Sequence, residues 1–337
     1  MTDPAEPASA RTPTDPMRVA AIDCGTNSIR LLVADVTPAD PARGVPAHLV
    51  DVHREMRVVR LGEGVDATGR ISTQALDRTW VALADYTAIL RASGAVDIRM
   101  AATSATRDAA NRADFVAMVV DTLGQEPEVI TGEDEAALSF AGAVGDLDPS
   151  TGPFLVVDIG GGSTEMVVGD MRGGRVEIAG AVSLDLGCVR ITERLLRADP
   201  PTPEQRATAR DWATGLISGG LDRLPLSGVR RLIPVSGTAT TVAAAALRLQ
   251  RYDPLAIHLA DISADSVGRV ADTLLRATRA HRAMLPYMHP GRVDVIGGGS
   301  LILSVLVDEV RRRLPAIEAI TVSEHDILDG LALSLAR

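Results

Sequence analysis

Two acidic residues flank a glycine-rich turn in the stretch Leu155–Val168, which reads LVVDIGGGSTEMVV. Asp158 ends an apolar run that is typical of a buried strand, and Glu165 stands at the start of a second run. Glycines can direct successive backbone N–H groups into one concavity that binds phosphate oxygens. The turn therefore predicts a phosphate site made by Gly160, Gly161, Gly162, Ser163 and Thr164. Carboxylates suit Mg²⁺, so we predict that Asp158 and Glu165 hold this ion beside the phosphate.

The same pattern occurs earlier, in VAAIDCGTNSIRLLV at residues 19–33. Aligning Asp23 with Asp158 places serine on serine and an apolar strand on an apolar strand, but it places Arg30 where the later turn has Glu165. The agreement indicates an internal duplication, with two related lobes that face each other across a cleft. In the first turn the predicted phosphate-binding residues are Gly25, Thr26, Asn27 and Ser28.

The composition restricts both the class of protein and its ligands. A chain of 337 residues is long enough for two domains. It contains no lysine, whereas a Walker A phosphate loop requires one. The net charge of −10 argues against general affinity for nucleic acids or anionic membranes. We therefore expect neither of these as a partner.

Cysteine and histidine usage indicates a cytoplasmic protein without a structural zinc motif. The two cysteines, Cys24 and Cys188, give neither a disulfide framework nor a zinc signature, which fits a reducing cytoplasm. The six histidines show no zinc-binding spacing, so each is interpreted as a surface or hydrogen-bonded residue. The first residues lack the basic and apolar regions of a signal peptide. The longest uncharged run, residues 232–247, is too short and too polar to span a bilayer.

Alternating strand and helix patterns predict an α/β architecture that positions these turns at strand ends. Four such turns are expected, at Asp23, Asp158, Ser236 and Gly297, the last entered by a strand at Val293–Ile296. The predicted division is a disordered tail (1–16), an N-terminal lobe (17–145), a C-terminal lobe (146–324) and a final helix (325–337) that packs back on the N-terminal lobe.

Other phosphate and nucleophile motifs fail. Neither Gly160 nor Gly297 begins a G-x-G-x-x-G dinucleotide motif, because the sixth position holds Glu165 or Ile302. A G-x-S-x-G nucleophile elbow does not occur in the sequence. A simple tight hairpin at Gly160–Gly162 remains an alternative for that turn alone.

Several motifs, in order along the chain, resemble those of the exopolyphosphatase/guanosine pentaphosphate phosphohydrolase family. They are AIDCGTNS at 21–28, RLGEG at 60–64, ATSATRDA at 102–109, ITGEDEA at 130–136, VDIGGGSTE at 157–165, LGCVR at 186–190 and SGT at 236–238. The resemblance covers nearly all of the chain from Met17 to Leu335. It implies the actin/Hsp70/sugar-kinase fold, with two duplicated actin-like (ribonuclease H-like) lobes and a ligand cleft between them.

The resemblance also implies an activity, which is hydrolysis of the terminal phosphoanhydride of inorganic polyphosphate or of the alarmone pppGpp. Glu135 matches the family's catalytic glutamate and is assigned as general base to the attacking water. The family implies a homodimer. The last helix begins Asp326-Ile327-Leu328-Asp329-Gly330, where many relatives have Arg-Glu-Gly, and this difference removes a positive charge.

Arginines supply the candidate phosphate clamps, because guanidinium groups bind phosphate bidentately. Arg107, in a loop after a strand, is the first candidate, and Arg30 and Arg190 are weaker ones. Arg54, Arg57 and Arg60 fit either a half-exposed strand or a track for polyphosphate.

Three functions remain open at this point. The first is hydrolysis, in which polyphosphate and guanosine penta- or tetraphosphate present equivalent phosphoanhydrides to the site. The second is a small-molecule kinase with an adenine pocket near Gly297–Ser300. The third is a sensor that binds polyphosphate or an alarmone without catalysis.

Overall fold

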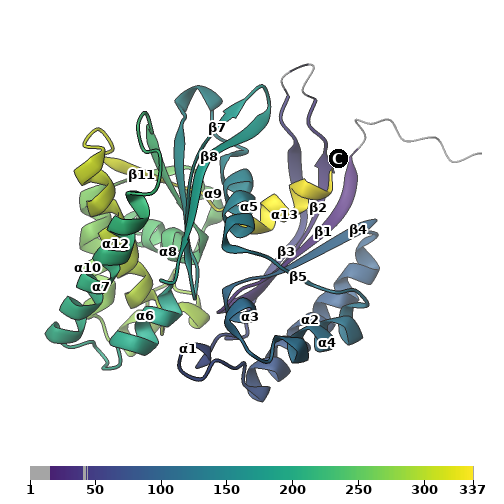
Figure 1. The fold of residues 1–337 in the computed structure, drawn as a ribbon, viewed down its shortest axis with the longest axis horizontal. Coiled ribbons are helices and arrows are strands. Elements are labelled where there is room, and N and C mark those ends of the chain that lie inside the picture. The colour runs from purple at the N-terminus through teal and green to yellow at the C-terminus, as the bar shows by residue number, and fades with distance from the viewer. Residues whose placement is uncertain (1–15, 41–42, 44, 337) are drawn as a thin grey trace, which may run out of the picture.

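Two mixed β-sheets form the framework of the computed structural model, which describes residues 16–40, 43 and 45–336 (Figure 1). The predicted tail at residues 1–15 lies outside the described residues. The first sheet has the strand order β3-β2-β1-β4-β5. Its strands are β1 (Met17–Cys24), β2 (Ser28–Thr37), β3 (His48–Val58), β4 (Asp97–Ala102) and β5 (Glu128–Val129).

Four helices follow the strands of the first lobe. They are α1 (Val65–Thr68), α2 (Thr73–Ser93), α3 (Ser104–Asp108) and α4 (Arg112–Leu123). Capping groups define both ends of α2: the Ser72 hydroxyl accepts the Ala75 N–H at the start, and Gly94 ends the helix in the left-handed conformation.

The second sheet has the order β10-β11-β9-β6-β7-β8. Its strands are β6 (Phe154–Ile159), β7 (Thr164–Arg172), β8 (Arg175–Leu184), β9 (Arg231–Val235), β10 (Ala260–Ser263) and β11 (Ala319–Val322). The helices of this half are α6 (Cys188–Leu195), α7 (Pro203–Leu221), α8 (Ser236–Ala246), α9 (Pro254–Ile257), α10 (Ala264–Arg276), α11 (Arg279–Ala283) and α12 (Ile296–Arg313), with 3-10 turns at Pro149–Thr151 and Pro290–Arg292. Within the described chain, none of the helices has the length and apolarity needed to cross a membrane.

The predicted duplication is confirmed by matching registers in the two sheets. In the antiparallel pair β1–β2, Asp23 lies opposite Arg30, and in the pair β6–β7, Asp158 lies opposite Glu165. The turns close with the same backbone hydrogen bond, from Gly25 N–H to the residue-28 carbonyl (2.9 Å) and from Gly160 N–H to the residue-163 carbonyl (3.0 Å). The order β3-β2-β1-β4 of the first sheet is repeated as β8-β7-β6-β9 in the second.

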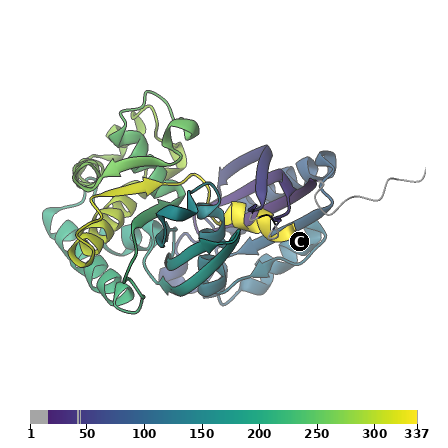
Figure 2. The same cartoon turned by 90° about the horizontal axis from the view of Figure 1, so that it is seen from above.

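Two helices cross between the halves of the molecule. Helix α13 (Ile327–Leu335) buries its apolar face against the first sheet, whereas α5 (Gly132–Val144) packs on the second sheet although the sequence analysis placed it in the first lobe. Both helices lie near the centre of the molecule, with α13 in yellow (Figures 1 and 2). They approach closely at glycines: a Cβ on Gly142 would lie 1.9 Å from the Asp326 carbonyl oxygen, and one on Gly330 would lie 2.0 Å from the Leu138 carbonyl oxygen.

The predicted strand at Val293–Ile296, with a turn at Gly297, is wrong. The residues before Ile296 form turns, and Gly297–Gly299 lie inside the first turn of α12. A Cβ on Gly298 would lie 2.6 Å from Thr192 Oγ1. These glycines therefore let α12 pack tightly on its neighbours instead of reversing the chain.

Candidate active site

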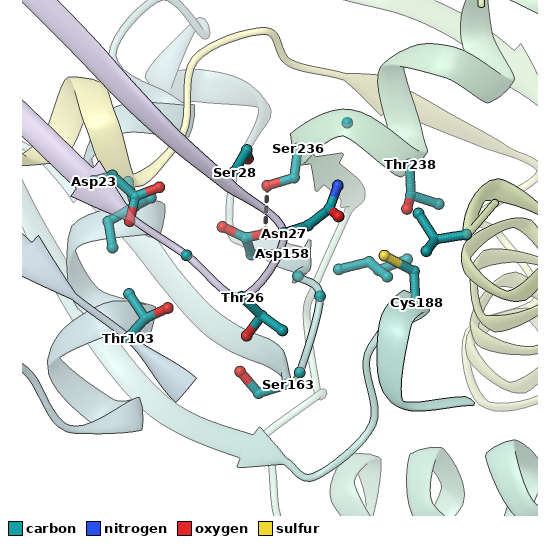
Figure 3. A pocket seen from close by; sticks show the side chains of 18 of the residues that line it. Asp23, Thr26, Asn27, Ser28, Thr103, Asp158, Ser163, Cys188, Ser236 and Thr238 are labelled. Atoms are coloured by element: carbon teal, nitrogen blue, oxygen red, sulfur yellow. Dashed lines mark hydrogen bonds between the residues drawn. The ribbon is translucent and has the colours of Figure 1, made fainter. Parts of the chain in front are cut away.

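The two glycine turns face each other across one cleft between the lobes (Figure 3). They are in contact, since a Cβ on Gly161 would lie 2.8 Å from the Thr26 Cβ. The cleft holds about 790 Å³ of atom-free space, counted out into the solvent at its open mouth. Its lining includes most of the predicted phosphate-binding residues: Gly25, Thr26, Asn27, Ser28, Gly160, Gly161, Gly162 and Ser163.

Two buried polar atoms of the first turn, Asp23 Oδ1 and the Thr26 hydroxyl oxygen, have no hydrogen-bond partner among the described residues. A buried hydroxyl left unpaired is costly, so this group is suited to a ligand oxygen in the cleft. The predicted ligand Thr164 differs, because its hydroxyl donates to the Leu186 carbonyl within its own lobe and does not line the cleft.

The acid of the first turn is compensated by an arginine. Arg30 donates to Asp23 at 2.7 Å and, on its other side, to Asp326 at the start of α13. Burial still raises the pKa of Asp23, although Arg30 opposes the shift. Arg30 is therefore occupied by two carboxylates and is not free to clamp phosphate.

The acids of the second turn lack such an arginine and are held by hydroxyl groups. Asp158 accepts hydrogen bonds from Ser139 (2.9 Å) and from Ser236, as Figure 3 shows for Ser236, while Glu165 accepts one from Ser183 (2.8 Å). Burial and the nearby Asp326 raise the pKa of Asp158 to about 6. Burial and the charges of neighbouring carboxylates raise that of Glu165.

The chemistry of this pair suits a hard divalent cation. Glu165 is 1% exposed, and its Oε2 has no hydrogen-bond partner among the described residues. Ser236, which orients Asp158, has φ = 67°, a strained conformation for a non-glycine residue that fits a functional site. Asp158 and Glu165 therefore fit the predicted Mg²⁺ by their oxygen ligands and uncompensated charge.

Glu135 projects into the cleft from the first turn of α5. That helix begins with a capping box in which Thr131 and Asp134 exchange hydrogen bonds, so Asp134 is an N-terminal capping residue. Burial raises the pKa of Glu135 to about 7 against the lowering effect of Arg107, and the charges of Asp158 and Asp23 make smaller contributions in the same direction as burial. A carboxylate that titrates near neutrality can accept a proton at physiological pH.

Arg107 is placed beside Glu135 and does not line the cleft as a clamp. Its guanidinium donates to Glu135 Oε2 at 2.6 Å and to the Ile130 carbonyl at 3.1 Å. The contact to Glu135 explains why the structure does not present Arg107 to phosphate directly.

The other arginine candidates are engaged by protein groups. Arg190 donates to the Gly162 carbonyl (2.7 Å) and to Asp66 and Asp108 of the first lobe. The three arginines of the possible polyphosphate track are each paired with carboxylates: Arg54 with Asp51 and Asp329, Arg57 with Glu55 and Asp85, and Arg60 with Asp294. Asp329, in the segment of the last helix that differs from many relatives, thus serves as the partner of Arg54.

Sequence reasoning missed Arg292, which lines the cleft. Its guanidinium donates to the Thr241 hydroxyl at 3.1 Å and lies 5.8 Å from the centre of the Tyr252 ring, and it forms no ion pair within the described part of the chain. A Cβ on Gly237 would lie 2.5 Å from Arg292 Nε, so this glycine makes room for the guanidinium. The sequence carries no signal for Arg292, because it stands alone after Pro-Gly.

Comparisons with known proteins identify relatives of this chain in sequence and in fold. A sequence model of the Ppx/GppA phosphatase family matches residues 42–335. The chain is 51% identical over 324 residues to exopolyphosphatase 2 of Mycobacterium tuberculosis, which covers 95% of this chain and 98% of the relative. An exopolyphosphatase-like protein of known structure superposes with a TM-score of 0.88 at 39% identity, covering 95% of this chain and 98% of the other. The Aquifex aeolicus member of the Ppx/GppA family gives 0.75 at 27% identity, with 95% and 97% covered.

Proposed function

Because the chain belongs to the Ppx/GppA phosphatase family, we propose that it is an exopolyphosphatase, which hydrolyses the terminal phosphoanhydride of inorganic polyphosphate. The observation that carries the proposal is the position of Glu135. This buried carboxylate, with a pKa of about 7, lines the cleft in which the two phosphate turns meet.

Glu135 acts as the general base. It takes a proton from the water molecule as that water attacks the terminal phosphorus, and the shortened chain leaves on the opposite side. Arg107 holds Oε2, which leaves the other carboxylate oxygen to accept the proton. Arg107 is thus a positioning residue for the base.

The two turns and Arg292 bind the substrate phosphates. The turn backbones and the Thr26 hydroxyl supply N–H and O–H donors, and Arg292 supplies a positive charge opposite them. Donors fixed in advance stabilise the charge that spreads over the transferred phosphoryl oxygens.

Asp158 and Glu165 are proposed to hold Mg²⁺. When bound, this ion would neutralise charge on the phosphate oxygens. Ser139, Ser183 and Ser236 fix the orientation of the two carboxylates by donating hydrogen bonds to them. A cytoplasmic location stays a prediction from cysteine usage, and a homodimer and the use of pppGpp stay predictions from the resemblance.

The test is phosphate release by the purified full chain with Mg²⁺, with Glu135→Ala as the catalytic blank. Substrates are short-chain polyphosphate, long-chain polyphosphate and pppGpp, with ATP plus an acceptor as the kinase arm. Release from polyphosphate that disappears in the blank is the expected result. Release from pppGpp alone would move the protein to alarmone hydrolysis, and binding without cleavage would make it a sensor. ATP-dependent transfer would make it a kinase.

A further inference from the structure

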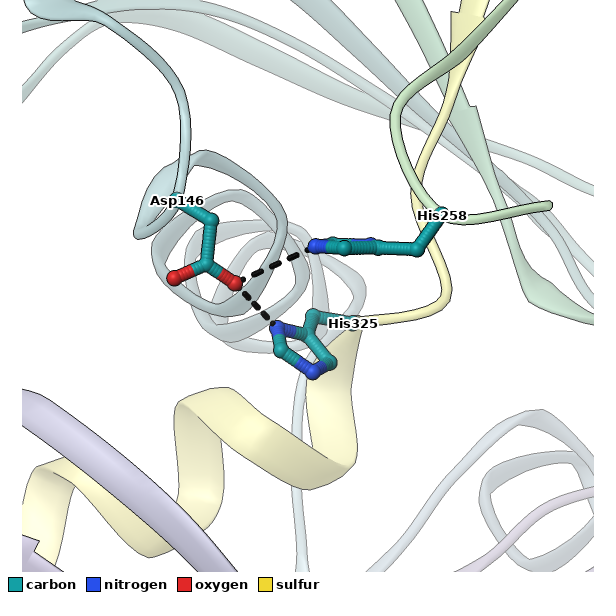
Figure 4. Close-up of side chains that lie close together, drawn as sticks. All are labelled: Asp146, His258 and His325. Atoms are coloured by element: carbon teal, nitrogen blue, oxygen red, sulfur yellow. Dashed lines mark hydrogen bonds and ion pairs between the residues drawn. The ribbon is translucent and has the colours of Figure 1, made fainter. Parts of the chain in front are cut away.

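A second group of possible metal ligands lies outside the cleft, where three distant segments meet (Figure 4). Asp146 follows α5, His258 ends α9, and His325 precedes α13. A single oxygen, Asp146 Oδ2, lies 3.2 Å from His258 Nε2 and 2.9 Å from His325 Nδ1. The three atoms lie within 4.8 Å of one another, and the carboxylate faces both rings in Figure 4.

We propose that Asp146, His258 and His325 bind a divalent transition-metal ion, with Zn²⁺ as the best fit. Two ligands of a tetrahedral zinc ion, with bonds of about 2.0–2.2 Å, are separated by about 3.3 Å. The distances from Asp146 Oδ2 to the two histidine nitrogens, 3.2 and 2.9 Å, are close to that value. Three protein ligands leave one position for water, and Asp146 is exposed, so an ion can enter from solvent.

The ligand types separate this site from the proposed Mg²⁺ site. Imidazole suits zinc and its neighbours in the transition series, whereas Mg²⁺ prefers carboxylates and water. Asp158 and Glu165 are carboxylates held by serine hydroxyls, with no imidazole or thiolate ligand among these contacts, and both cysteines are buried, so we expect neither the carboxylate pair nor the cysteines to compete well for zinc. The inference does not depend on the proposed function.

In the metal-free protein, a proton on His258 occupies the position at which zinc would bind. The Glu324 N–H donates to His258 Nδ1 at 3.3 Å, which leaves the proton of that ring on Nε2, facing Asp146. Metal binding at Nε2 would shift this proton to Nδ1 and so break the Glu324 contact, which is at the long end of the hydrogen-bond range. Zinc affinity should weaken as the pH falls, because protons compete with the metal for the imidazole nitrogens.

A carboxylate also lies behind the other histidine, His325. His325 Nε2 lies 3.9 Å from Asp329 Oδ1, and Asp329 is itself held by Arg54 of β3. A carboxylate behind a ligating histidine is a common arrangement in zinc sites. Asp326, the next residue, holds Arg30 of the first turn, so zinc would fix the point at which the chain enters α13.

The test is zinc binding by full-length protein that carries no histidine tag. The protein is treated with EDTA and dialysed into excess Mg²⁺, which fills oxygen-ligand sites, and is then titrated with Zn²⁺ against a chromogenic chelator. We expect one tight zinc ion per chain, an affinity at least tenfold lower in His258→Ala and in His325→Ala, and a Tm that rises with free zinc only where both histidines are present.

Two controls separate this site from other zinc binding. His281→Ala removes an exposed histidine of α11 and should bind zinc as the wild type does. Glu165→Gln alters the cleft and should also keep the zinc ion. Co²⁺ in place of Zn²⁺ should give the visible absorption of a low-coordinate nitrogen and oxygen site.

Two results would overturn the proposal. One is a wild-type protein that binds no stoichiometric zinc, or that binds it no better than His258→Ala. The other is a Tm difference between wild type and His258→Ala that changes with pH but not with zinc, which would make the cluster a protonated ion pair.

Discussion

The two glycine turns have the same backbone but opposite charge at one position. In the first turn the strand opposite Asp23 carries Arg30, and in the second the strand opposite Asp158 carries Glu165. The first acid is neutralised and tied to Asp326, whereas the second pair is left with buried, uncompensated charge. The two turns thus share one backbone pattern, and the residue opposite each aspartate makes the first a structural anchor and the second a candidate cation site.

The largest expected effect tests whether Glu135, which lines the cleft, is the catalytic base. Glu135→Gln keeps the size of the side chain and removes the base, so kcat should fall by about 10²–10⁴-fold. The Tm in the absence of Mg²⁺ should stay the same or rise, because one buried carboxyl is removed. Polyphosphate hydrolysis near the wild-type rate would remove Glu135 from the mechanism.

The next effect tests the anchor role of the first turn. Arg30→Met leaves Asp23 and Asp326 buried without their cation, which should cost about 3–5 kcal/mol in the free energy of unfolding. Urea denaturation measures the change. Arg172→Met, which breaks an exposed pair with Asp170, is the control and should change stability little. Equal losses in both variants would contradict an anchor role for Arg30.

Glu165→Gln should change the stability of the Mg²⁺-free protein in the opposite direction from Arg30→Met. Removing an uncompensated buried charge should raise the Tm of the Mg²⁺-free protein, while the Mg²⁺ concentration needed for half-maximal activity should rise by at least about tenfold. Thermal unfolding and an activity titration with Mg²⁺ provide the two readouts. An unchanged Mg²⁺ requirement would argue that Glu165 is not a ligand.

The pH dependence sharpens the same contrast. Native Glu135, with a pKa of about 7, keeps a proton that the unfolded chain loses near pH 4.5, so the unfolding free energy of the Mg²⁺-free protein should fall as the pH rises through that window. Activity should instead rise with pH as Glu135 loses its proton. The midpoint of this rise should lie at or below about pH 7, because bound Mg²⁺ favours the carboxylate. Glu135→Gln should lose its share of the stability change, and a wild-type stability that rises over this window would contradict the assignment.

The smallest expected effect compares two threonines. Thr26→Val removes a hydroxyl that faces the cleft without a partner, so KM should rise by roughly fivefold, which corresponds to about 1 kcal/mol. Thr164→Val should lower stability by about 1 kcal/mol and leave KM unchanged, because its hydroxyl bonds to the Leu186 carbonyl. Steady-state kinetics with both variants would show whether only the first turn's threonine contacts substrate.

The local features of the fold could be predicted from the sequence because their signals lie close together in the chain. The two turns show a repeated pattern of aspartate, glycine and serine, and helix α2 has its start signal at Ser72 and its stop signal at Gly94. The turn predicted at Gly297 was wrong because glycine occurs both where the chain reverses and where helices pack closely. Only the contacts of residues 297–299 with neighbouring helices distinguish the two cases.

The partners of the site could not be predicted, because they come from distant segments. Arg107 was predicted to bind phosphate, but in the structure it is paired with Glu135, which lies beyond β5 in the chain. Arg292 reaches the cleft from a loop that carries no motif. The histidines were interpreted singly, and His258 and His325 converge on Asp146 only when α9 and α13 are placed.

The covering of the first sheet by α13 has a consequence for the order of folding. Val19, Leu32 and Ala101 of that sheet are buried against Leu328 and Leu331, which are separated from β1 by about nine-tenths of the chain. During synthesis this face must stay uncovered until residues 327–335 have left the ribosome. Nascent chains stalled before α13 should therefore bind chaperones or be cut by protease in their first lobe, whereas chains stalled after it should not. The half of the molecule that is made first would then be the last to become stable.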